Sequence, residues 1–227
     1  MWPASSETTS LQKDFLSADV CVSRPVGSLE STSSSDVRCQ YFLSNARSWW
    51  KVDILLNALS ALNSPVTIEC VTSTGSDSPV CYITDLNKIQ IQASAFLTPF
   101  QYRRALARGL TYAFDNARAK IDYSNVDHLT CTSIRGANIS GECDLWTKWT
   151  EYIGEDPLGM HMYSMKQRCI REKVKDNISM QSKIHTSSQI DASIDKVWDR
   201  CFRDHWPFTT EPHMDTRFRE SPLVRKQ

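Results

Sequence analysis

The chain has 227 residues, enough for one domain with a buried core or for a domain flanked by tails. Hydrophobic residues make up 41% of it and charged residues 23%, and 26 basic residues balance 26 acidic ones. This neutrality argues against a nucleic-acid-binding protein, for which a basic excess is the expected footprint. No stretch approaches the ~18 uninterrupted apolar residues of a membrane-spanning helix, so we expect a protein that is soluble or peripheral to a membrane.

Residues 1–36 are polar and rich in serine and threonine, and their composition predicts an extended tail. Glu7, Asp14 and Asp19 argue against a mitochondrial presequence, and no apolar stretch there indicates a secretory signal. If the protein is targeted to an organelle, we expect the signal to be internal.

Residues 37–205 are predicted to form one domain that begins with a helix over Tyr41–Leu62, where apolar residues recur at helical spacing. Asn63-Ser64-Pro65 ends this helix. Three short strands are expected next, at Val66–Val71, Val80–Ile83 and Lys88–Gln92. Since they follow one another through short links, they predict a small β-meander.

The second half of the domain is predicted to be helical. After Pro99, Leu106, Leu110 and Phe114 belong to one apolar helix face. Two or three more helices are expected over roughly 126–153, 162–178 and 189–204, and a proline-containing extended tail over 206–227. The predicted fold class is therefore α+β, a small β-meander packed on a bundle of about five helices.

The chain contains eight cysteines, and none forms a C-x-x-C pair. They are Cys21, Cys39, Cys70, Cys81, Cys131, Cys143, Cys169 and Cys201. Their even number and wide spacing favour disulfides in an oxidising compartment, with buried free thiols as the alternative. Cys131 and Cys143 are ~18 Å apart if they share one helix, so each should bond to another element. Cys169 and Cys201 are the expected partners, and Cys70 with Cys81 is a further predicted pair across the hairpin.

Several runs in the second half resemble a family of mitochondrial inner-membrane-associated metallopeptidases that matures a subunit of ATP synthase and helps assemble that enzyme. In the family, a zinc-binding H-E-x-x-H opens a stretch that ends in A-F-D. The motifs R-A-x-x-D-W and C-x-E-[IV]-R-A-A-N-[LI]-S-G-[DE]-C follow. The residues that match these motifs here include Asp115, Arg118, Asp122, Arg135 and Asn138. The likeness continues in Gln-Arg-Cys-Ile-Arg at 167–171 and Cys-Phe-Arg-Asp-His-Trp-Pro-Phe at 201–208. It implies a zincin-like metallopeptidase scaffold over roughly Cys39–His213.

The positions that would carry the chemistry of the family depart from its pattern. Arg108 and Tyr112 stand where the two histidines of H-E-x-x-H belong, and Gly109 replaces the glutamate. Ser133 replaces the acid of C-x-E, a plausible third ligand. An arginine has no lone pair for a metal, and glycine cannot take a proton from a zinc-bound water. We therefore expect no catalytic residues, no metal and no cofactor.

We also expect Arg108 to occupy the position of the lost zinc ion and to pair with an acid there. Asp115, two helical turns further along, and Asp122 are the candidates. His128, His205 and His213 could rebuild a metal site elsewhere, but we interpret them as ordinary hydrogen-bonded or surface histidines.

These observations lead to three functional hypotheses. The first is a non-catalytic pseudo-peptidase of the mitochondrial intermembrane space, peripheral to the inner membrane. Its partners would be the protein subunits of a respiratory-chain complex, in which it acts as accessory subunit or assembly factor, complex I being favoured over ATP synthase. The second is a free chaperone-like peptide binder, and the third is a metallopeptidase with a displaced metal site.

Overall fold

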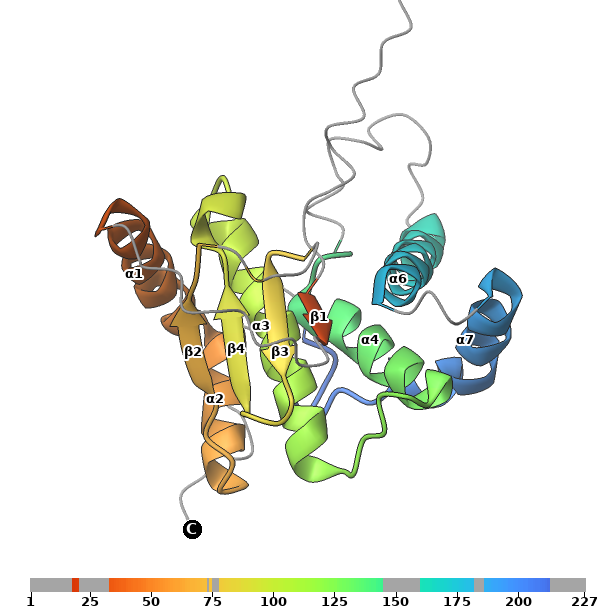
Figure 1. The fold of residues 1–227 in the computed structure, drawn as a ribbon. Helices are drawn as coiled ribbons and strands as arrows, with labels where there is room; N and C mark the ends of the chain where they lie inside the picture. Colours follow the sequence, from red (N-terminus) through yellow and green to blue (C-terminus); the bar gives the residue numbers. More distant parts are fainter. Residues whose placement is uncertain are drawn as a thin grey trace, which may run out of the picture.

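The computed structural model describes residues 18–20, 33–72, 74, 78–144, 160–181 and 186–212. A small sheet packs against helices, which confirms the α+β class (Figure 1). The strands are β1 (Ala18–Val20), β2 (Thr67–Cys70), β3 (Val80–Ile83) and β4 (Lys88–Ile91). The helices are α1 (Ser33–Arg47), α2 (Trp50–Ala61), α3 (Pro99–Arg118), α4 (Val126–Ser140), α6 (Met160–Gln181) and α7 (Ser187–Phe202), with a 3-10 turn η2 (Ala93–Ala95).

The sheet has the strand order β1-β3-β4-β2, so the predicted meander is wrong. A tight turn joins β3 to β4 as an antiparallel pair, while β2 runs parallel to β4 and β1 parallel to β3. The reason lies in burial. Ile89 and Ile91 of β4 are fully buried, as a central strand requires, whereas the residues of β2 are exposed or half-buried and suit an edge.

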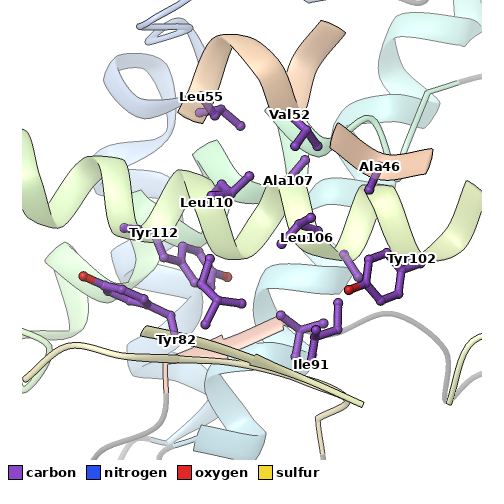
Figure 2. Close-up of a cluster of buried hydrophobic side chains, with 14 of the residues drawn as sticks. Ala46, Val52, Leu55, Tyr82, Ile91, Tyr102, Leu106, Ala107, Leu110 and Tyr112 are labelled. Atoms are coloured by element: carbon purple, nitrogen blue, oxygen red, sulfur yellow. The ribbon is translucent and has the colours of Figure 1, made fainter. Parts of the chain in front are cut away.

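Helix α3 forms the centre of the first hydrophobic core. Figure 2 shows it between α2, with Val52 and Leu55, and the sheet, with Tyr82 and Ile91. Thr98 and Gln101 form a capping box at its start, with Pro99 in the first turn, and these contacts satisfy backbone N–H groups that would otherwise lack a partner.

The helix predicted over Tyr41–Leu62 is two helices, α1 and α2. The chain is extended at Trp49 (φ −82°, ψ 123°), which ends one helix and begins the next. The break allows both helices to pack on α3 at different angles. On the α1 side, Phe42 meets Tyr102 edge-on, with ring centroids 5.5 Å apart.

A second hydrophobic core joins α4, α6 and α7. The predicted helix over 126–153 ends earlier, because Gly141 adopts a left-handed conformation (φ 73°) and caps α4. The later helices were predicted to within a few residues of α6 and α7.

Parts of both predicted tails belong to the folded domain. Strand β1 and the start of α1 come from 1–36, and Phe208, from 206–227, packs into the first core. The remainder of 1–36 and all of 213–227 lie outside the described residues.

Candidate functional site

The positions that match the family's catalytic motifs meet at the boundary between the two cores. Arg108 and Tyr112 lie one turn apart on α3, and Ser133 lies on α4. All three are buried. We call Arg108, Gly109, Tyr112 and Ser133 the vacated centre.

Arg108 is paired with Glu142, which follows α4, and not with Asp115 or Asp122 as predicted. The side chains of Arg108 and Glu142 are 2% and 0% exposed. Lys173 of α6 lies 3.7 Å from the same carboxylate. The prediction failed because seven residues of helix place Asp115 ~10 Å further along α3, beyond the reach of this guanidinium. Glu142 stands at the acidic position of the family's S-G-[DE]-C motif, and that acid was the signal that sequence reasoning missed.

The side-chain amide of Asn177 on α6 links Tyr112 and Ser133 of the vacated centre. Asn177 Nδ2 donates to the Tyr112 hydroxyl at 2.9 Å and lies 3.4 Å from Ser133 Oγ. All three side chains are buried, so α3, α4 and α6 are joined here by hydrogen bonds between neutral groups.

Two glycines, Gly109 and Gly136, allow close packing around the vacated centre. A Cβ on Gly136 would lie 2.9 Å from Tyr112 Cε1 and 3.1 Å from Arg108 Cγ. The family motif has alanine at this position, so the glycine makes room for side chains larger than histidine. A Cβ on Gly109 would lie 3.3 Å from Val80 Cγ1 of β3, so the sheet packs closely where the family has its glutamate.

The residues of the vacated centre do not fit a zinc ion. Arg108 has no lone pair to donate, and its guanidinium is engaged by Glu142. Tyr112 and Ser133 share one amide donor, and Gly109 has no side chain.

A second polar cluster occupies the C-terminal half of α3. Arg135 Nε donates to both oxygens of Asp115, at 3.0 and 2.9 Å, and its other nitrogens contact the Asp204 carboxylate (2.6 Å) and the Trp206 carbonyl (2.6 Å). Arg118 also pairs with Asp115 and with Asp204. We call Asp115, Arg118, Arg135 and Asp204 the retained network, because all four match the family motifs.

Electrostatics within the retained network favour the charged forms. Burial alone would lower the pKa of Arg118, but the hydrogen bond to Asp204 and the charge on Asp115 outweigh it and hold that pKa above its ordinary value. Burial alone would raise the pKa of Asp204, but the bond from Arg118 and the charge on Arg135 lower it.

The other two matched residues lie nearby. Asn138 Nδ2 donates to the carbonyl of Phe202 at the end of α7, at 3.0 Å. Asp122 is exposed in the loop after α3, where hydrogen bonds from Ser124 lower the pKa of its carboxyl. Asp122 thus belongs to neither cluster.

The turn 141–144 carries a further acid into the interior. Asp144 lies 3.6 Å from Nζ of the fully buried Lys51 and 3.4 Å from Nζ of Lys166, which also contacts Glu211. Burial lowers the pKa of Lys51 to about 8, and the charge on Asp144 offsets only part of that effect.

The disulfides join elements that are distant in sequence. Cys131 bonds to Cys201 and Cys143 to Cys169, the expected partners. The predicted Cys70–Cys81 pair is wrong, because β4 separates their strands and Cys70 bonds to Cys39 of α1. Cys81 is disulfide-bonded too, and Cys21 lies outside the described residues.

Of the three candidate histidines, His128 and His205 lie within the described residues. His128 Nδ1 accepts the backbone N–H of Asp122 at 3.1 Å. His205 is partly buried, which lowers its pKa, and His213 lies outside the described residues. Within the described ranges, no group of three or more His, Cys, Asp or Glu side chains could hold a metal ion. The helices of that same part of the chain include none long and apolar enough to cross a membrane.

Curated proteins similar to this chain are mitochondrial proteases. The chain is 36% identical over 113 residues to the mitochondrial inner membrane protease ATP23 homolog of Xenopus laevis. The aligned residues cover 48% of this chain and 44% of the relative. The chain is 32% identical over 115 residues to the human homolog (50% and 44%) and 34% identical over 107 residues to ATP23 of Saccharomyces cerevisiae (45% and 44%). The matched part therefore spans less than half the length of these relatives. No solved structure is a significant match.

These relatives overturn one expectation. The predicted accessory role in complex I is wrong, since the similar proteins are named as ATP23 proteases of the mitochondrial inner membrane.

The family profile described as Peptidase M76 family matches residues 38–209, which include both polar clusters. Since the match covers most of the sequence, the chain belongs to the Peptidase M76 family.

Proposed function

We propose that this chain is a non-hydrolytic member of the family that acts by binding another protein, as a chaperone-like factor in the assembly of ATP synthase. We place it in the intermembrane space, peripheral to the mitochondrial inner membrane, on a zincin-like scaffold without zinc. Two observations support this compartment: the relatives are named as proteases of the mitochondrial inner membrane, and disulfides form in an oxidising environment.

One observation carries this proposal. The place of the zinc ligands holds an interlocked buried cluster, in which Arg108 pairs with Glu142, and Asn177 links Tyr112 to Ser133. Gly136 makes room for this cluster. A centre that had only lost its ligands would leave unpaired polar groups, which are costly when buried. This centre has instead been rebuilt as part of the core.

Hydrolysis by the family's chemistry needs a base beside an activated water. None of the five histidines of the chain is followed by glutamate, so H-E-x-x-H occurs nowhere in it. Without hydrolysis, the function must come from the surfaces through which the folded domain binds other proteins.

The decisive experiment is metal analysis of the purified full chain together with a peptidase assay, using Saccharomyces cerevisiae ATP23 as the positive control. We expect substoichiometric zinc and no chelator-sensitive cleavage. One zinc per chain with zinc-dependent cleavage would overturn the proposal in favour of a displaced metal site.

The binding role is tested separately in isolated mitochondria. Under native electrophoresis most of a chaperone-like factor should migrate as free protein, and a smaller fraction should migrate with assembly intermediates of ATP synthase. That bound fraction should increase when assembly is blocked. If the chain is wholly absent from those intermediates, the assembly role fails even where hydrolysis is absent.

A further inference from the structure

A pocket of ≈ 450 Å³ lies beside the retained network, away from the vacated centre. Its walls come from the loop after α3, one face of α4 and the second half of α7. Asp115, Arg118, Arg135 and Asp204 all line it. This volume is in the range that holds a small ligand or a few side chains of a peptide.

The charges around the pocket do not balance. Five cationic side chains line it against three acidic ones. Each acid is already engaged: Asp115 and Asp204 by the arginines of the retained network, and Asp127 by Lys196. Lys120 and Arg200 are exposed, and within the described part of the chain neither has an ion-pair partner. The surplus is therefore two cations at the rim.

His128 adds a hydrogen-bond donor to this wall. Because its Nδ1 accepts the backbone N–H of Asp122, the neutral ring carries its proton on Nε2. The groups available to a ligand here are thus donors and cations.

The pocket also has an apolar side. Ile121 and Val197, both half-buried, line it together with the Cys131–Cys201 disulfide. A complementary ligand would place an oxyanion at the rim and an apolar group against this wall.

We propose that the pocket binds an acidic segment of a partner protein, in which an aspartate or glutamate carboxylate lies next to an apolar side chain. The inference rests on the proposed function, since it names the chemistry of the protein that this chain binds. A segment of this kind would meet Lys120 and Arg200 with its carboxylates and Val197 with its apolar group.

The observations favour a peptide over a lipid bilayer. Surface binding to a bilayer needs large apolar side chains that insert beside the cations. The exposed large apolar side chains of the described residues are Val37, Tyr41, Leu62, Leu86, Leu97 and Trp206. None of them lines this pocket.

The test uses the full oxidised chain and a fluorescent peptide of alternating glutamate and leucine, compared with one of alternating glutamine and leucine. The variant is Lys120→Gln/Arg200→Gln. Its matched control, Arg168→Gln/Lys175→Gln, makes the same charge change on α6. Binding is measured by fluorescence anisotropy at low salt, and methyl NMR of Ile121 and Val197 reports where the peptide lies.

We expect the wild type and the control to bind the acidic peptide about tenfold more tightly than the amide peptide, with an affinity that falls as salt rises. The Lys120→Gln/Arg200→Gln variant should lose that preference. Circular dichroism checks that the variants are folded.

Three outcomes would overturn the inference: no preference for the acidic peptide, an equal loss in both variants, or peptide binding without methyl shifts at Ile121 and Val197. Binding to phosphatidylglycerol vesicles in place of the peptide would also overturn it and assign the pocket to a membrane. Each of these outcomes is distinct from zinc-dependent cleavage, which is what would overturn the non-hydrolytic function.

Discussion

The vacated centre and the retained network both use α3 and α4, yet their polar groups are held differently. On α3, Arg108 and Asp115 are about two helical turns apart, whereas Ser133 and Arg135 are neighbours on α4. In the retained network, two arginines and two aspartates share several hydrogen bonds, and Arg135 also binds main-chain carbonyls. In the vacated centre, one ion pair to Glu142 and one bridging amide from Asn177 hold the buried polar side chains.

The difference separates two roles of a polar cluster in a fold. The retained network ties α3 and α4 to the segment after α7, so its loss would loosen the packing of these elements. In the vacated centre, Gly136, Asn177 and Glu142 accommodate the buried side chains of Arg108 and Tyr112. The polar groups at the matched catalytic positions are therefore held separately from the network that ties the helices together.

The largest effect is expected from Arg135→Met. It leaves Asp115 buried with Arg118 as its remaining cation and removes the bond to the Trp206 carbonyl, and should lower the free energy of unfolding by about 3–5 kcal/mol. Urea denaturation at neutral pH measures the change. Lys175→Met, which breaks an exposed pair with Asp191, is the control and should cost less than about 1 kcal/mol. Equal losses of unfolding free energy in the two variants would show that the buried pairs of Arg135 stabilise the fold no more than an exposed ion pair does.

Arg108→Met should cost about 3 kcal/mol, because the buried Glu142 loses its ion pair with the arginine, and Lys173 lies 3.7 Å from the same carboxylate. Adding Glu142→Leu should restore at least about half of that loss, since an apolar pair can replace a buried ion pair. The corresponding double change, Arg135→Met/Asp115→Leu, should restore little, because the carbonyls that Arg135 binds and the other partners of Asp115 remain unpaired. Double-mutant cycles by urea denaturation compare the two clusters, and similar recovery in both would contradict the comparison.

Lys51→Met tests the cost of the charges beside the vacated centre. The folded-state pKa of Lys51 is about 8, below the value of 10.5 for a free lysine, so between these values the unfolded chain binds more protons and wild-type stability rises with pH. The destabilising charge is present in full below about pH 8. The stability of wild type relative to Lys51→Met should therefore increase by about 2 kcal/mol from pH 7.5 to pH 10. Parallel stability curves for the two proteins would rule out a charged, buried Lys51.

The smallest effect is expected from Gly136→Ala. The added methyl group meets Tyr112 and Arg108 at 2.9 and 3.1 Å, and crowding should outweigh the better helix propensity of alanine by about 1 kcal/mol. In a Tyr112→Ala background the same change should cost less, because the 2.9 Å contact is gone and the contact with Arg108 Cγ at 3.1 Å remains. Thermal unfolding of the four proteins gives both values, and a stabilising effect in the wild-type background would show that Gly136 makes no room for Tyr112.

Local patterns in the sequence predicted most of the helices. The apolar face of α3 and the Pro99 start identified that helix, and helical spacing placed α6 and α7. Strand order could not be predicted, because β3 and β4 pair locally whereas the place of β2 depends on which strand buries both faces. Strand β1 was missed because three residues in a polar segment give no period.

The sequence predicted which residues occupy the site but not which residues they contact. The motifs showed that Arg108, Gly109, Tyr112 and Ser133 had changed. The partner of Arg108 was sought on its own helix, yet it comes from the turn after α4, where the left-handed Gly141 redirects the chain. Contacts of this kind depend on how helices cross, which the sequence of one helix does not contain.

The disulfides of Cys131 on α4 and of Cys143 in the turn after it have a consequence for passage of the chain through a narrow pore. One closes a loop over a sequence separation of 70 residues to α7, and the other over 26 residues to α6. A reduced, unfolded chain can pass through a narrow pore as a single extended strand. Once both bonds form, several segments of the chain would have to pass through the pore side by side. Oxidation therefore makes passage through a narrow pore harder. The bonds that hold these helices together would thereby also hinder passage of the oxidised protein through such a pore.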